Sequence, residues 1–115
     1  TSVSHDSHNI IVVGAGEEDM AAAVNRVAEN RGGIVVMEGG RVQGEVALPV
    51  AGLMSDGTLE EANSALEAAK DAAFALGVSR EIDPFMTLSF MSLPVIPTLR
   101  LTTRGVIDVD KQQYV

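Results

Sequence analysis

The chain has 115 residues, 46% of them apolar and 21% charged, a balance typical of one compact domain with a buried core. We therefore expect residues 1–115 to form a single domain. A net charge of -8, with three Phe, one Tyr and no Trp, argues against nucleic acid and anionic membranes as partners. The sequence has no cysteine and no segment resembling a secretion signal or membrane span, which predicts a cytoplasmic protein.

The first two predicted elements are a strand and a helix. Residues 9–13 form a short apolar run, typical of a strand buried on both faces of a sheet. After the Gly14-Ala15-Gly16 turn, residues 17–31 carry apolar side chains at helical spacing, with acidic residues in the first turn. We predict a central strand over 9–13 and a helix over 17–31.

A hairpin and a second helix are predicted next. Residues 33–37 and 41–48 are two apolar-rich strands, and Gly39-Gly40 between them can form a two-residue turn. Thr58 and Glu61 have the spacing of a capping box, so the second helix is expected to begin after Thr58 and to end at Gly77.

The C-terminal third is predicted to be extended. Asp83-Pro84 breaks the chain, and residues 85–93 alternate imperfectly, as an edge strand does. Residues 98–103 and 106–110 are expected to pair as a hairpin, which leaves 111–115 as a tail. This order of elements predicts an α/β chain of the α+β type, with a mixed β-sheet and two main helices packed on it.

Two further features could suggest a binding site, but each is more simply explained as part of the fold. Gly14-Ala15-Gly16 lacks the third glycine of a dinucleotide fingerprint, and the acidic residues that follow would repel a phosphate. The apolar residues could line a ligand pocket or an interface, but such residues more often fill a core; they are Met54, Phe85, Met86, Phe90 and Met91.

The polar run at residues 5–9 holds both histidines of the chain. Imidazole can act as acid, base or metal ligand near neutral pH, and Asp and Asn can orient it. However, three ligands within four residues cannot converge from a strand, and no further His or Cys exists to complete a site. The spacing alone favours a hydrogen-bonded loop before a strand over an autonomous catalytic segment, and predicts no metal held by this chain alone.

Ordered blocks along nearly the whole chain resemble the C-terminal domain of bacterial adenine deaminase, a member of the amidohydrolase superfamily. Together they are more specific than any single motif. The blocks are Ser4-His5-Asp6-Ser7-His8-Asn9-Ile10, Glu18-Asp19-Met20-Ala21, Ala23-Val24-Asn25, Gly32-Gly33-Ile34-Val35-Val36, Ala51-Gly52-Leu53-Met54-Ser55-Asp56, Asp83-Pro84-Phe85-Met86-Thr87-Leu88-Ser89-Phe90, Leu93-Pro94-Val95-Ile96-Pro97 and Leu99-Arg100-Leu101-Thr102.

The resemblance implies a hydrolase that converts adenine to hypoxanthine and ammonia with metal-activated water, in purine salvage and adenine catabolism. It implies a manganese or iron pair held by a barrel domain that is absent from these residues. The chain would flank or cover that active site, support a homo-oligomer, and be inactive alone. The candidates for approaching the substrate are His5, Asp6, Ser7, His8 and Asn9.

A second hypothesis, in which the chain is not part of an enzyme, stays open. The chain would then be an independent, non-enzymatic α/β module that binds a small ligand or drives oligomerisation. The polar loop would be its site or only part of its fold.

Overall fold

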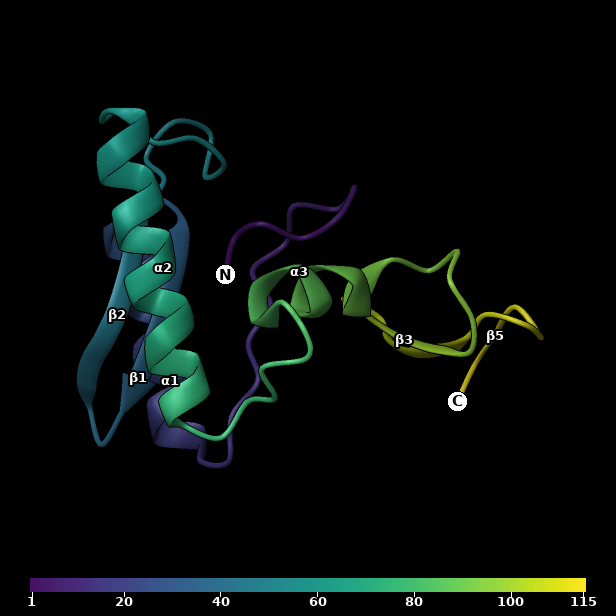
Figure 1. Ribbon diagram of the computed structural model, residues 1–115. Helices are drawn as coiled ribbons and strands as arrows, with labels where there is room; N and C mark the ends of the chain where they lie inside the picture. The colour runs from purple at the N-terminus through teal and green to yellow at the C-terminus, as the bar shows by residue number, and fades with distance from the viewer.

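The computed structural model describes residues 1–115 and has an α+β fold, which confirms the predicted class. The molecule extends over 43 × 28 × 28 Å, with a small sheet projecting from a helical body (Figure 1). Its strands form two separate antiparallel sheets, β1–β2 and β3–β4–β5, rather than one mixed sheet. In chain order the elements are α1 (Glu17–Glu29), β1 (Gly33–Glu38), β2 (Arg41–Ala47), α2 (Leu59–Ala75), α3 (Pro84–Ser89), the 3-10 helix η1 (Phe90–Ser92), β3 (Leu99–Thr102), β4 (Gly105–Asp108) and β5 (Gln113–Tyr114).

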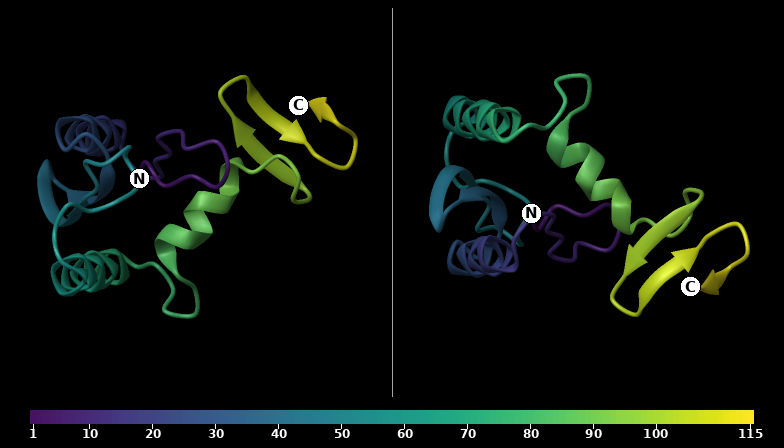
Figure 2. Two further views of the ribbon diagram at one scale, coloured as in Figure 1. Left: turned by 90° about the horizontal axis from the view of Figure 1, so that it is seen from above. Right: turned by 90° about the horizontal axis from the view of Figure 1, so that it is seen from below.

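The body is a two-stranded hairpin with a helix on each side (Figure 2). Successive residues of a strand point to opposite faces. Gly44 of β2 accordingly lies against α2, while its neighbour Glu45 bonds to α1. The main core lies between the hairpin and α2, and it is formed by Ile34, Val46, Leu48 and Ala69.

The termini of the two long helices follow local signals. Thr58 and Glu61 form the predicted capping box at the start of α2. At its end Gly77 takes a φ of 100°, and the Gly77 and Val78 amides bond back to the carbonyls of Phe74 and Ala73. The predicted second helix and its glycine stop are therefore confirmed.

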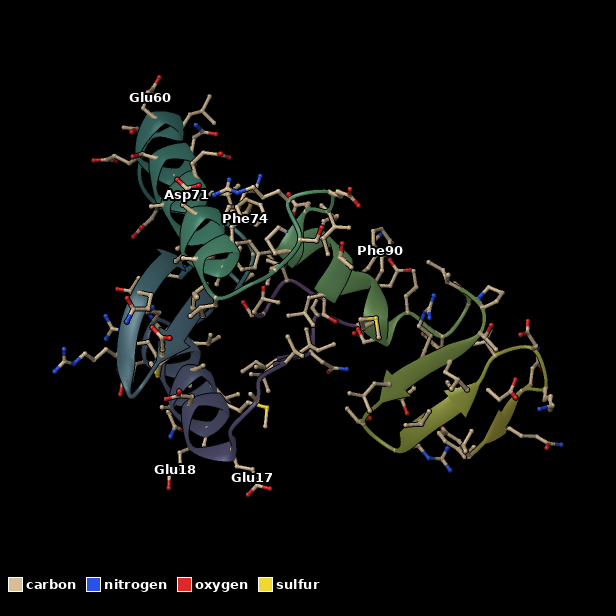
Figure 3. All side chains as sticks on the ribbon, turned by 60° about the horizontal axis from the view of Figure 1, so that its bottom comes forward. Glu17, Glu18, Glu60, Asp71, Phe74 and Phe90 are labelled. Atoms are coloured by element: carbon tan, nitrogen blue, oxygen red, sulfur yellow. The ribbon has the colours of Figure 1, made fainter.

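The acidic start of α1 does more than match the helix dipole. Asp19 accepts hydrogen bonds from the Gly39 and Gly40 amides, at 2.9 and 2.7 Å, and so fixes the turn of the hairpin. Glu17 and Glu18 point away from the body into solvent (Figure 3). Their carboxylates stand at the helix N-terminus, where negative charge is favourable.

The predicted extended segment over 85–93 is wrong, because the chain forms α3 and η1 there. The Asp83 carboxylate accepts hydrogen bonds from the Phe85 and Met86 amides, at 3.1 and 2.9 Å. Pro84 occupies the first helical turn, where its missing N–H costs nothing. The residues interpreted as a break are thus a helix start.

The predicted C-terminal hairpin is confirmed as β3 and β4. The chain then turns once more, and β5 pairs with β4 through Ile107↔Tyr114 and Asp108↔Gln113. The tail predicted over 111–115 is therefore partly a third strand.

An ion pair joins α1 to β2. Arg26 donates from Nε and Nη2 to the two carboxylate oxygens of Glu45, at 2.8 and 2.9 Å, and Asn30 Nδ2 adds a third bond at 3.1 Å. Hydrogen bonding from Arg26 holds the pKa of Glu45 below its ordinary value of 4.5.

This pair predicts a pH dependence of stability. Because the folded pKa of Glu45 is depressed, its contribution is complete above about pH 4.5 and is lost as the pH falls through the folded pKa. In Glu45→Gln, the free energy of unfolding should fall less steeply as the pH is lowered through that window. The difference in slope corresponds to at most about one proton taken up on unfolding. Urea titrations between pH 3 and pH 7 measure this slope, and parallel wild-type and variant curves would contradict the assignment.

Candidate functional site

Residues 1–11 form a loop whose two ends are hydrogen-bonded to each other, and they do not lead into a strand of a sheet. The Thr1 nitrogen donates to the Ile11 carbonyl at 2.9 Å, and the Ile11 amide donates back to the Thr1 carbonyl at 2.9 Å. The strand predicted over 9–13 is therefore wrong. Within residues 9–13, Ile11 bonds to Thr1 and not to a neighbouring strand, and Val13 is 76% exposed.

Serine side chains anchor this loop to the body. Ser2 Oγ accepts from the Gly33 amide at 2.8 Å and donates to the Gly52 carbonyl at 2.6 Å. Ser4 is completely buried, and its hydroxyl bonds to those of Ser7 and Ser92. The loop is thus fixed to the β1 end of the hairpin and to η1.

The candidate residues lie beyond these anchors, and all five are exposed. The His5 amide donates to the Ser89 carbonyl at 3.0 Å, and the His5 ring stacks on Phe90 with centroids 4.9 Å apart. Figure 3 shows Phe90 between the body and the C-terminal sheet. The His5 imidazole therefore sits on a fixed aromatic support.

The structure brings together some of the candidates and separates others. His5 Nδ1 lies 3.3 Å from Asp6 Oδ1, so this carboxylate can orient the imidazole. The side chains of His8 and Asn9 make no hydrogen bond within the chain, although the His8 amide donates to the Ser4 carbonyl at 2.9 Å. Their polar atoms are free for an external group.

Two of the candidates adopt strained backbone angles. Asp6 has a φ of 61° and His8 a φ of 51°, in the left-handed region that side chains other than Gly rarely occupy. Such strain persists only where surrounding contacts impose it, and it clusters at functional sites. Here the serine anchors supply those contacts.

The metal pair implied by the resemblance does not fit this loop. No three side chains of His, Asp or Glu come close enough in residues 1–115 to hold an ion. The chemistry available to the loop is that of two exposed imidazoles, a carboxylate and an amide, which donate, accept or transfer protons.

Sequence reasoning missed the residues that position the loop. Ser89 and Ser92 are three residues apart, a spacing that places them on one side of a short helix, and both are buried. Ser92 holds the loop through its side chain, whereas Ser89 contributes only its backbone carbonyl. The sequence signal is therefore Ser92, a polar residue in an apolar-rich segment. Recognising it required knowing that α3 exists.

No helix in the chain combines the length and apolar character needed to cross a membrane.

Comparison with known proteins supports the resemblance. A family model described as adenine deaminase C-terminal domain matches residues 1–113. Adenine deaminase 1 of Rhizobium johnstonii is 54% identical over 111 residues, which are 96% of this chain and 19% of that protein. Adenine deaminase of Sinorhizobium fredii is 55% identical, and that of Brucella melitensis is 51% identical over 115 residues, each with 20% of its length covered. The chain thus spans about a fifth of the length of these relatives, and it belongs to the adenine deaminase C-terminal domain family.

Proposed function

We propose that this chain is the C-terminal domain of a longer adenine deaminase, which hydrolyses adenine to hypoxanthine and ammonia. Its relatives named adenine deaminase, and the small share of their length that it matches, support this. A manganese or iron pair would be held by the part of the enzyme outside this domain. The enzyme would be cytoplasmic and homo-oligomeric, and would act in adenine catabolism and purine salvage.

Within that enzyme, the loop from His5 to Asn9 is the part of the domain that reaches the substrate entrance. The observation that carries this proposal is that buried side chains hold the loop in place, while some exposed side chains of the same loop make no hydrogen bond within the chain. Ser2 and Ser4 hold the loop, whereas the side chains of His8 and Asn9 contribute no bond to the fold. Two exposed imidazoles on a loop held by buried serines, with His8 at a positive φ, are arranged for contact with another group.

The test is adenine turnover by the full-length enzyme carrying His5→Ala or His8→Ala. Loss of one polar contact to the reacting complex should lower kcat/KM by roughly tenfold or more. The thermal midpoint of His8→Ala should match wild type, because its side chain bonds to nothing in the domain. Asn63→Ala, at an exposed position of α2, is the matched control and should leave kcat/KM unchanged.

Two results would contradict the proposal. Wild-type kinetics in both histidine variants would show that the loop serves the fold alone. A natural gene product with an intact mass near the 12.1 kDa of this chain would favour the independent, non-enzymatic module.

A further inference from the structure

One face of the small C-terminal sheet exposes several apolar side chains. Leu99 and Leu101 alternate with Arg100 and Thr102 along β3, and Val106 of β4 pairs directly with Leu101. Leu99, Leu101 and Val106 therefore share a face, which we call the apolar sheet face. Their exposed fractions are 48%, 48% and 38%.

The rest of the domain leaves the three residues of the apolar sheet face exposed. The sheet projects from the body (Figures 1 and 2), and η1 is the helix that packs on its first strand. Arg100, Thr102 and Ile107, on the opposite face, are only partly exposed. Strands of four, four and two residues form a small sheet, which gains stability when its apolar face is packed.

The size of the face indicates what covers it. Three side chains present on the order of a few hundred Å², well below the roughly 800 Å² per partner typical of stable association between separate proteins. A contact within one polypeptide avoids most of the entropy cost of association, so a small area is sufficient. Relatives of this chain have about four-fifths of their length outside the domain.

We infer that the apolar sheet face docks onto an apolar surface of the polypeptide that precedes this domain in the full-length enzyme. The inference rests on the proposed placement of the domain in a longer adenine deaminase. It adds that the β3–β4–β5 sheet is the connection that holds this domain against the rest of the enzyme. The partner surface should be apolar opposite Leu99, Leu101 and Val106. Asp108 pairs with Leu99 and shares this face, but it is buried and its charge is met by Lys111.

Hydrogen exchange on the full-length protein tests this contact, with Leu101→Lys as the variant. A lysine on the docked face should speed exchange of the β3 and β4 amides on the order of tenfold, while residues 17–75 keep wild-type exchange and report that the domain is folded. Leu99→Ser should give a smaller increase. Thr103→Lys, an exposed charge added at the turn of the same hairpin, should change exchange by no more than about twofold.

Unchanged exchange in Leu101→Lys would overturn the inference. So would protection of β3 and β4 that falls on dilution together with the molar mass measured by light scattering, because a second copy would then cover the face. The measurement needs no substrate. Loss of protection in a protein whose turnover is insensitive to His5 and His8 would reject the proposed role of the loop and retain the docking contact.

Discussion

Replacing Gly44 by valine should lower the free energy of unfolding of the domain by about 3 kcal/mol or more. Gly44 lies close against α2: a Cβ placed there would be 2.8 Å from Ala69 Cα and 3.2 Å from Ala72 Cβ. Ala69 Cα belongs to the helix backbone, so relief requires α2 to move off the hairpin. That movement opens the core that Ala69 shares with Ile34 and Val46.

The measurement for Gly44→Val is urea unfolding of the chain followed by circular dichroism. Typical domains have only 5–15 kcal/mol of stability, so a loss of this size should shift the midpoint strongly. Gly16→Ser is the matched control, because a side chain there meets no atom within 4 Å and serine is a good helix N-cap. A midpoint for Gly44→Val equal to that of the control would show that α2 does not pack as described.

The helices and hairpins were predictable where the signal is local. The Thr58 capping box, the Gly77 stop and the Gly39-Gly40 turn each depend on residues within five positions of one another, and all three are confirmed. Apolar spacing along a single element similarly places α1 and β1. These features need no knowledge of what the element packs against.

Predictions failed where an apolar pattern had to be matched to a partner. Residues 9–13 have strand composition, but no neighbouring strand pairs with them, because Thr1 takes the bonds of Ile11. Residues 85–93 alternate enough to suggest a strand, yet the Asp83-Pro84 start is a helix signal, and it outweighs the alternation. Composition shows that a segment is buried or extended, but not which surface it meets.

The same limit applies to the candidate site. Residues 5–9 were predicted to form a hydrogen-bonded loop before a strand. The Ser7 and His8 amides, bonded to the His5 and Ser4 carbonyls, confirm the loop, but no strand follows it. The contacts to Ser89 and Ser92 span more than 80 residues, so no spacing within the polar run could indicate them. The role of the loop in catalysis stays a prediction.

Ser4→Leu should disrupt the loop from within and destabilise the domain by about 2–4 kcal/mol. Ser4 is 0% exposed, so a larger side chain has no room, and the hydroxyls of Ser7 and Ser92 lose their partner. Because α3 and η1 hold the loop through this contact and the Ser89 carbonyl, residues 5–9 should shift with it. Urea unfolding measures the loss, and Ser64→Leu, on the exposed side of α2, is the control.

In the full-length enzyme, Ser4→Leu tests whether the loop must be held in place, and His8→Ala tests whether a loop side chain makes a contact at the substrate entrance. If the loop acts at the substrate entrance, both should lower kcat/KM, but only Ser4→Leu should also lower the unfolding midpoint. Ser92→Ala should fall between them: Ser4 keeps its bond to Ser7, so the stability loss should be about 1 kcal/mol and the loop should stay near its place. A destabilised Ser4→Leu enzyme with wild-type kcat/KM would mean that residues 5–9 can move without consequence for the reaction. The His5 ring would then serve packing against Phe90 and nothing beyond it.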